Sequence, residues 1–479
     1  MERPQLKWVQ HELTIPASSP LWSLVHVHNA ATNQAIGRLR VDLPDLSAYP
    51  DPLDKIRLLL SKAAEVEHAL LVQYLYSAYS LAPPTSVTDP QQQASLRGWR
   101  RSISQIAREE MGHLMTVQNL RLLVSLEPDF GRDDFPMVAG LFPFDTHLSP
   151  LTQRILAQYI VAESPPDAQG IEDIIQLATG GGSRVNRVGV LYALIGVALA
   201  KDLGEVEVDA AGGDPWSVMV RQIAYLAYEQ NPPSSTWHLP GNAFNAASQS
   251  CQGQQDDWAP VDTNIRIFAV ASRADAKLAI GNIGIQGEGV SQSADTQSHF
   301  YRFLKLFRGD GTITPFPTPG GWNPTLDVPT DPKTVGVDAD PSVISHPTTA
   351  LWAKLADVRY AILLGCLEEY LKNQPLLNRQ NLCTICIDEM RTNFRGLSDK
   401  LVAMNRKSTG TAKAALPFEL PTSGMPLPSG ADARRQIHIG RLNQAIALEE
   451  MIIASQGDAF IQAMRTKDQN TLSQFQPPP

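Results

Sequence analysis

The stretch "REEMGHLM", residues 108–115, places two acids and a histidine inside an apolar repeat. Glu110 and His113 are three residues apart, so on a helix they lie on one face. Apolar residues recur around them at steps of three to five, which is typical of a helix with a buried side. A carboxylate and an imidazole are costly to bury unless they are paired or bind a metal ion. The stretch therefore predicts metal ligands, and the alternative is a solvated face of Glu with Arg108 or Arg121.

A second cluster of acids and histidine, "EVEH", lies in the preceding helical stretch. That stretch, residues 54–81, contains no Pro or Gly and is apolar nearly all round, which predicts a buried helix. Glu67 and Tyr74 share one of its faces, while Glu65 and His68 share another. The pattern favours Glu67 as a partner for the next helix, and Glu65 with His68 remains the rival pair.

Two further stretches contain candidates for the rest of a metal site. Bundles that hold two metal ions take one Glu from each of two helices and a Glu-x-x-His pair from each of the other two. "YIVAESPP" carries Glu163, and "QGEGVSQSADTQSHFYRF" carries Glu288 and His299, with glycines that argue against one continuous helix between them. Neither of these two stretches contains a second Glu-x-x-His. The predicted metal ligands are Glu67, Glu110, His113, Glu163, Glu288 and His299.

Helices must position these residues, and most of the chain carries helical patterns. The first two are joined by a short break and are expected to pair antiparallel. Strand signals are confined mostly to the first 45 residues. The fold class predicted is mainly α, a four-helix bundle with long loop insertions and additional C-terminal helices. The helical stretches are residues 54–81, 91–126, 151–165, 187–201, 263–285, 298–307, 346–404 and 431–464.

The chain divides into four predicted parts. They are an N-terminal strand and loop segment at 1–50, a metal-binding helical bundle with insertions at 51–308, a Pro/Gly-rich linker at 309–345, and a C-terminal helical region packed on the bundle at 346–479. Within the bundle, residues 231–260 are predicted to form a long ordered loop that shapes the pocket. Trp216, Trp237 and Trp258 lie in or near this loop, where they either stack on an aromatic substrate or pack the loop itself.

Two other acid pairs, Glu368–Glu369 and Glu449–Glu450, lie in amphipathic helical patterns with Lys and Arg nearby. They are predicted to be solvated faces. The chain has four cysteines, too few for a disulfide framework, and its one CxxC is predicted to be two buried thiols.

Composition limits the partners. The chain has 479 residues, 43% of them hydrophobic, and a formal net charge of −9, so it lacks the basic footprint of a nucleic-acid-binding protein. Its longest apolar run, "VGVLYALIGVALA", is shorter than the roughly 20 residues of a membrane-spanning helix. The sequence predicts a soluble cytoplasmic protein that acts on a small molecule. It contains no GxSxG, P-loop, dinucleotide-binding or HExxH motif.

Five segments in order, "EVEHALLVQYLYSAYSL", "REEMGHLMTVQNLRLLVS", "IVAESPP", "QGEG…SHFYRFLKL" and "ALPFELP", give the chain a family resemblance. It resembles the iminophenyl-pyruvate dimer synthase family, the ferritin-like module of chromopyrrolate and violacein-pathway synthases in bacterial secondary metabolism. The resemblance implies a ferritin-like four-helix bundle that holds one or two non-haem iron ions and uses dioxygen as co-substrate. It assigns the six predicted ligands to the iron and places Tyr74 beside them as a catalytic hydrogen-bond partner. The well-known members are much longer chains.

The resemblance implies an iron-dependent oxidoreductase acting on an amino-acid-derived small molecule by oxidative coupling of two imine or enamine units. One alternative is a ferritin-like oxygenase or desaturase that acts on a monomeric substrate. Another is a non-catalytic helical subunit that serves a biosynthetic enzyme. The expected associations are a homo-oligomer or a partner biosynthetic enzyme.

Overall fold

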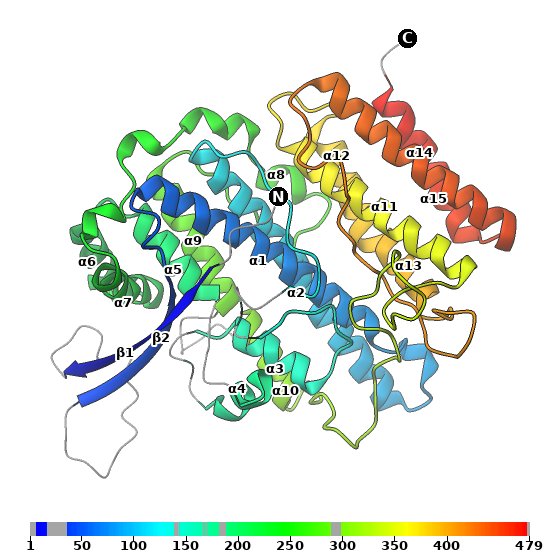
Figure 1. Ribbon diagram of the computed structural model, residues 1–479, viewed down its shortest axis with the longest axis horizontal. Helices are drawn as coiled ribbons and strands as arrows, with labels where there is room; N and C mark the ends of the chain where they lie inside the picture. The colour runs from blue at the N-terminus through cyan, green and yellow to red at the C-terminus, as the bar shows by residue number, and fades with distance from the viewer. Residues whose placement is uncertain are drawn as a thin grey trace.

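The computed structural model describes residues 6–16, 36–137, 142, 144–165, 168, 170–181, 188–288 and 298–476. Near the N-terminus, β1 (Trp8–Pro16) pairs antiparallel with β2 (Ile36–Pro44) in a two-stranded sheet that projects from the helical body (Figure 1). The rest is mainly helical, as predicted. Within the described residues, no helix combines the length and the apolar character needed to cross a lipid bilayer.

The centre of the molecule is a pair of long helices, α1 (Pro52–Ser80) and α2 (Pro90–Leu123), which pack on each other (Figure 1). Each begins with a proline behind an aspartate cap. The Asp51 carboxylate accepts from the Leu53 N–H at 2.6 Å, and that of Asp89 accepts from the Gln91 N–H at 2.7 Å. Residues are buried around almost the whole circumference of α1, which confirms the prediction from its apolar pattern.

Two shorter helices, α5 (Val188–Leu199) and α9 (Arg273–Glu288), complete a four-helix bundle with this pair, and α3 (Gln153–Ala162) and α10 (His299–Arg308) pack beside them. α5 packs on α1 and on α9, and α9 also contacts α2. α3 and α10 pack on each other, and α10 contacts both α2 and α9. α9 ends at Glu288 and α10 begins at His299, and the break predicted between them lies outside the described residues. This layer is thus built from short helices, whose ends lie along the middle of α1 and α2 (Figure 1).

The helix predicted over residues 263–285 begins later than expected, after Ser272. The preceding segment is not helical, and side-chain amides bind its backbone: the N–H of Val270 donates to Gln252 Oε1 at 2.7 Å instead of to a helical carbonyl. The start of α9 is then fixed by reciprocal bonds, in which the N–H of Asp275 donates to Ser272 Oγ and the Ser272 hydroxyl donates to the Asp275 carboxylate.

The C-terminal helices cover the other side of α1 and α2. α11 packs on α12, α13 and α14, while α13 contacts α1, and α14 and α15 form the outer edge (Figure 1). A π-helix, η6, joins α12 to α13. The bounds are α11 (Pro347–Tyr370), α12 (Arg379–Asp388), η6 (Glu389–Asn393), α13 (Phe394–Leu401), α14 (Ala431–Gln456) and α15 (Ala459–Phe475).

The prediction that the acid pairs of these C-terminal helices are solvated is wrong for three of the four acids. Glu368, Glu369 and Glu449 are each at most 1% exposed. They are buried because each has a cation, as in the 2.8 Å contact between Glu369 Oε2 and Arg434 Nε. The CxxC cysteines are buried free thiols on α12, as predicted.

The remaining elements extend the bundle layer. α6 and α7 pack on each other, and α7 packs on α5. Trp237 and Trp258, in the predicted loop 231–260, are fully buried, so they pack the loop itself. The remaining helices are η2 (Pro84–Ser86), α4 (Glu172–Thr179), α6 (Leu203–Ala211), α7 (Pro215–Gln230), η3 (Ser234–Thr236), η4 (Gly241–Ala243), η5 (Ala246–Cys251) and α8 (Gln255–Trp258).

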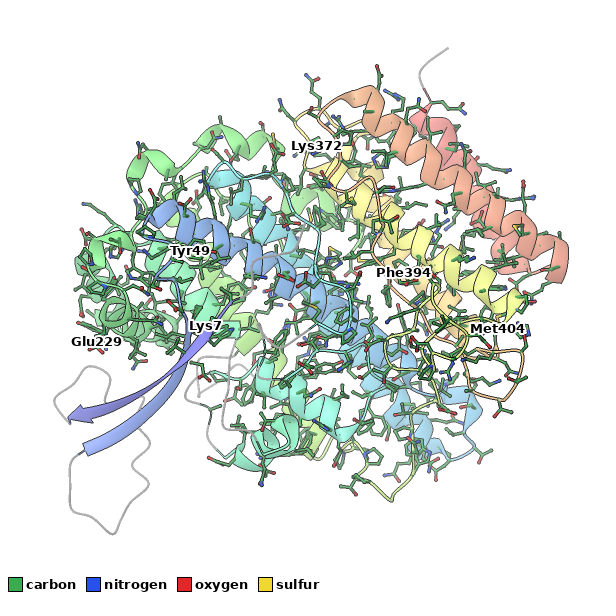
Figure 2. The ribbon with its side chains drawn as sticks, in the orientation of Figure 1. Lys7, Tyr49, Glu229, Lys372, Phe394 and Met404 are labelled. Carbon is green, nitrogen blue, oxygen red and sulfur yellow. The ribbon has the colours of Figure 1, made fainter. Side chains whose placement is uncertain are left out.

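Residues 309–345 lie against the body of the molecule. Leu81 and Thr325 form an isolated antiparallel bridge, and the carboxylate of Asp331 accepts from the Leu148 N–H at 2.8 Å. The division of the chain into four parts stays a prediction. Figure 2 shows how side chains fill the spaces between the helices.

Candidate metal centre

Five of the predicted ligands meet inside the bundle. Glu67 comes from α1, Glu110 and His113 come from α2, Glu163 is the residue that ends α3, and His299 begins α10. Each is at most 2% exposed. Side chains from two long helices and two helix ends therefore reach one buried point.

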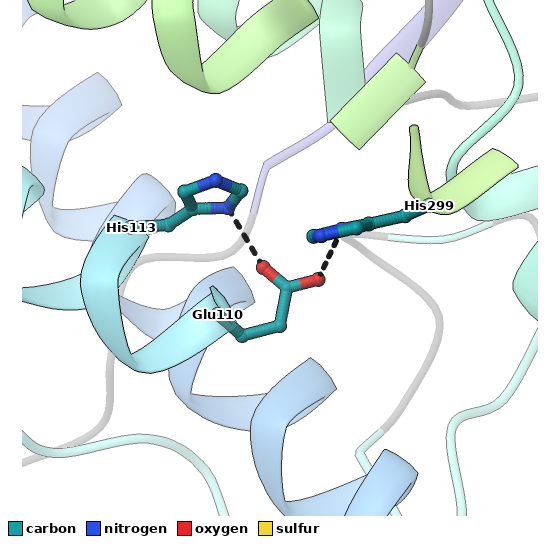
Figure 3. A group of neighbouring side chains, drawn as sticks. All are labelled: Glu110, His113 and His299. Carbon is teal, nitrogen blue, oxygen red and sulfur yellow. Dashed lines mark hydrogen bonds and ion pairs between the residues drawn. The ribbon is translucent and has the colours of Figure 1, made fainter. Parts of the chain in front are cut away.

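Glu110 is the common partner of the two imidazoles (Figure 3). Its Oε2 lies 2.9 Å from Nδ1 of His113, and its Oε1 lies 2.8 Å from Nδ1 of His299. The ring centroids of the two histidines are 5.3 Å apart. Ligand atoms of all three residues lie within 4.8 Å of one another, a spacing that fits a shared metal ion.

Glu67 and Glu163 flank this group on opposite sides. Oε2 of Glu67 lies 3.5 Å from Nδ1 of His113, and Oε1 of Glu163 lies 3.7 Å from Nδ1 of His299. The hydroxyl of Tyr74 donates to Glu163 Oε1 at 2.5 Å, so the predicted hydrogen-bond partner touches a predicted ligand. The backbone of Glu288 ends α9, and its side chain lies outside the described part of the structure.

The rival pair on α1 faces away from this group. Glu65 Oε2 contacts Lys62 Nζ at 2.7 Å, and the His68 ring hydrogen-bonds to the hydroxyl of Tyr360 on α11. The geometry thus places Glu67, rather than Glu65 or His68, beside Glu110.

The alternative reading of α2 as a solvated Glu–Arg face does not describe this helix, because both acids of its "REEM" stretch are buried. Arg108 instead lies 3.3 Å from Asp262, and Arg121 donates to the carbonyl of Glu127 at 2.9 Å.

Burial and mutual repulsion set the charges of the carboxyl groups. Burial, and then the negative charge of Glu110, raise the pKa of Glu67 and that of Glu163. Burial also acts to raise the pKa of Glu110, but the two imidazoles outweigh it and hold that pKa well below its usual range. Burial opposes charge on His113, yet its carboxylate partners raise its pKa to about 10. The group therefore concentrates carboxylates whose negative charge must be balanced, either by protons on the imidazoles or by a bound metal cation.

Two further residues support the imidazoles, and the sequence reasoning missed both. Glu109 Oε2 accepts from Nε2 of His299 at 3.0 Å and from Nη1 of Arg302 at 2.6 Å. Burial raises the pKa of Glu109, but His299 and Arg302 overcome it and lower the pKa to about 2. Gln286 Oε1 lies 3.2 Å from Nε2 of His113. The available signals were the Glu doublet at 109–110 and the glutamine that precedes Gly287.

Three observations indicate that these residues can hold a metal ion. Glu67 Oε2, Glu110 Oε1 and His299 Nδ1 are buried without a hydrogen bond of good geometry, although buried polar atoms normally have one. Carboxylate and imidazole are the donors of non-haem iron and related ions. The adjoining cavity has a volume of about 10 Å³, which is enough for one water molecule or one ion.

That cavity is lined by the bundle helices. Its described lining includes Leu70, Val188, Tyr192, Ile283 and Gly287 beside the acids and His113, and no residue of the 231–260 loop. The prediction that this loop shapes the pocket is therefore wrong for the described lining.

Comparisons with known proteins identify the family of the chain. The ferritin-like family model matches residues 60–308, a range that contains all six predicted ligands. The chain is 25% identical over 419 residues to dichlorochromopyrrolate synthase from Lentzea aerocolonigenes, a match that covers 81% of this chain and 38% of that synthase. The chain thus spans well under half the length of this relative.

A solved structure, of a ferritin-like protein from Caulobacter vibrioides, aligns with 70% of this chain and 93% of its own at 17% identity and a TM-score of 0.37. The family-model match covers more than half of the chain. The chain therefore belongs to the ferritin-like family.

Proposed function

We propose that this protein is a non-haem iron-dependent oxidoreductase of secondary metabolism. The observation that carries the proposal is the buried meeting of Glu67, Glu110, His113, Glu163 and His299, with three of their donor atoms lacking a well-formed hydrogen bond. Burying three carboxyl groups together is costly unless a cation balances their negative charge. The carboxylates and imidazoles would hold one or two iron ions, which supply redox chemistry with dioxygen when bound.

The chain's own residues would orient the ligands. Tyr74 donates to Glu163 and fixes the direction of its carboxylate. Glu109 accepts from the outer nitrogen of His299, which leaves Nδ1 of that ring directed at Glu110. A carboxylate behind a ligating histidine raises its basicity and fixes its tautomer. Buried apolar walls from α1, α5 and α9 would exclude bulk water.

We propose an amino-acid-derived substrate and oxidative coupling as the reaction. The similarity to dichlorochromopyrrolate synthase and the five sequence segments support this assignment. Joining two enamine carbons breaks one C–H bond at each carbon and forms one C–C bond. The two protons and two electrons released would pass to dioxygen and give hydrogen peroxide. Because the chain matches only 38% of that synthase, a partner enzyme or a second copy of the chain could share the full activity.

Product analysis tests the proposal. Iron-loaded protein is incubated under air with an aromatic amino acid and an amino-acid oxidase, and products are measured by mass spectrometry. A product with the mass of a coupled dimer, absent with Glu110→Gln/His113→Gln, is expected. A monomer that gains oxygen or loses hydrogen would favour the oxygenase or desaturase instead. No turnover by the iron-loaded protein alone would favour the helical partner subunit.

A further inference from the structure

A second and larger cleft lies on the other side of α1 and α2. Its volume is about 600 Å³, and it is bounded by α1, α2, the end of α12, η6 and α13. The metal centre faces α3, α5, α9 and α10, whereas this cleft faces the C-terminal helices. Its volume is in the range of sites that bind small organic molecules.

Arginines dominate the polar lining of this cleft. Four project from α2, one from η6 and one from α13, although the chain as a whole carries a net charge of −9. This concentration of like charge is unfavourable unless anions offset it. The arginines are Arg97, Arg100, Arg101, Arg108, Arg391 and Arg395.

Neighbouring acids offset only part of this charge. Arg100 lies 3.3 Å from Asp399, and Asp262 is shared between Arg108 at 3.3 Å and Arg391 at 4.0 Å. The one acid in the lining, Asp388, is paired with Lys467 at 3.3 Å.

The other three lining arginines, Arg97, Arg101 and Arg395, have no carboxylate at ion-pair distance among the residues that the structure describes. The cleft therefore keeps a surplus of positive charge.

The floor of the cleft is apolar. Leu71, Leu75 and Tyr79 of α1 are buried beneath the arginines, and Met390 of η6 lies opposite. The hydroxyl of Tyr79 points to the Met390 carbonyl at 3.5 Å. A ligand that fills this space would bury an apolar portion on the floor while its charges meet the guanidinium groups.

One wall of the cleft is anchored by buried charge. Glu389, in η6, receives two bonds from the guanidinium of Arg359, at 2.9 Å and 2.5 Å. Arg359 also contacts Glu449 and Asp468, so η6 is joined to α11, α14 and α15. π-Helical turns occur frequently at functional sites, and this one places Met390 and Arg391 in the cleft. Phe394, labelled in Figure 2, is buried directly after η6, and its ring packs against Tyr360 and Phe418.

We propose that this cleft binds a small organic anion that carries at least two carboxylate or phosphate charges beside an apolar body. Guanidinium groups pair with both kinds of oxyanion in bidentate fashion. The unpaired arginines would meet the charges, and the floor of Leu71, Leu75 and Tyr79 would meet the apolar body. The site is separate from the metal centre, and it does not depend on the proposed function.

Calorimetric titration with naphthalene-2,6-dicarboxylate tests the site. The full chain is expected to bind this dianion, and Arg101→Gln/Arg395→Gln is expected to bind it about tenfold more weakly, because two charge-assisted contacts are lost. The charge-matched control is Arg57→Gln/Arg154→Gln, at two exposed arginines outside the cleft, and it should bind like the wild type. Iron content should be equal in all three proteins.

Four outcomes would overturn the proposal. The first is no binding of the dianion by the wild type, and the second is equal loss of binding in both double variants. The third is equal binding of the uncharged naphthalene-2,6-dimethanol, which would show that charge does not select the ligand. The fourth is inorganic phosphate binding as tightly as the dicarboxylate, which would contradict the role of the apolar floor because phosphate has no apolar body.

Discussion

The carboxylate of Glu110 links the two histidines of the candidate metal centre, because it contacts both imidazole rings. Its link to His113 could be predicted from the sequence, since three residues on a helix fix their common face. The link between Glu109 and His299 joins residues 190 positions apart, and only the folded chain brings them together. The choice between Glu67 and Glu65 with His68 likewise depends on which face of α1 meets α2, which a helix that is apolar all round does not reveal.

Removing the hydroxyl of Tyr74 tests the role of a residue next to a ligand. Tyr74→Phe is expected to retain iron but to lower product formation about tenfold, because Glu163 loses the donor that orients it. The measurements are iron content and the rate of product formation.

Tyr76→Phe is the control on the same helix, since the hydroxyl of Tyr76 donates to the carbonyl of Pro329 and not to the centre. Equal rates for the two variants would contradict the assigned role of Tyr74.

At the scale of elements, the site depends on helix ends and on close packing against α2. The sequence predicted α1, α2 and α10, because apolar repeats are local signals. It did not predict the non-helical segment before α9, because the amides that hold that segment come from Gln255 and Gln252, which lie 12 and 18 residues before their partners. Gly112 of α2 faces this segment.

The packing at Gly112 gives a stability prediction. A Cβ at this position would lie 2.4 Å from the carbonyl oxygen of Arg266, so Gly112→Ala forces the backbone apart and is expected to destabilise the fold by about 1–3 kcal/mol. Gly98→Ala on the same helix meets nothing within 4 Å and should stabilise it by about 0.5–1 kcal/mol. Denaturant unfolding compares them, and equal stability of the two variants would refute the close approach.

The segment "ALPFELP", residues 415–421, docks onto α11 through Asp357. Asp357 Oδ1 accepts from the N–H of Glu419 at 3.0 Å, and the hydroxyl of Thr334 lies 3.1 Å from its Oδ2. Burial, and then the charge of Glu419, raise the pKa of Asp357 well above its usual range. The folded protein therefore holds a proton that the unfolded chain releases, and this contribution to stability is lost as the pH rises from about 4 through the raised pKa.

Asp357→Asn tests this docking contact, because the amide is neutral at every pH. The melting temperature of the variant is expected to fall less between pH 5 and pH 8 than that of the wild type. Asp388→Asn, at an acid whose side chain is 43% exposed, should follow the wild type. An equally steep fall in Asp357→Asn would show that the pKa of Asp357 is not raised.

At the scale of the whole molecule, α1 and α2 separate two sites. One side carries the bundle layer and the metal centre, and the other carries the C-terminal helices and the arginine-lined cleft. The mainly α fold and the bundle could be predicted, because the helical periodicity is strong and the motifs resemble a family. The buried charges of Glu368, Glu369 and Glu449 could not, because they become internal only when α11 meets α14 and α15. The arginine cleft escaped prediction for the same reason, since its arginines come from α2, η6 and α13.

Metal content is the measurement that tests the central claim most directly. Elemental analysis of protein purified without chelator is expected to find about one or two iron ions per chain. Glu110→Gln/His113→Gln should lose this iron while its circular dichroism stays unchanged. Glu65→Gln/His68→Gln, on the other face of α1, should retain it. Wild-type protein that holds no iron after anaerobic loading, or a Glu110→Gln/His113→Gln variant that holds as much as the wild type, would contradict the metal centre.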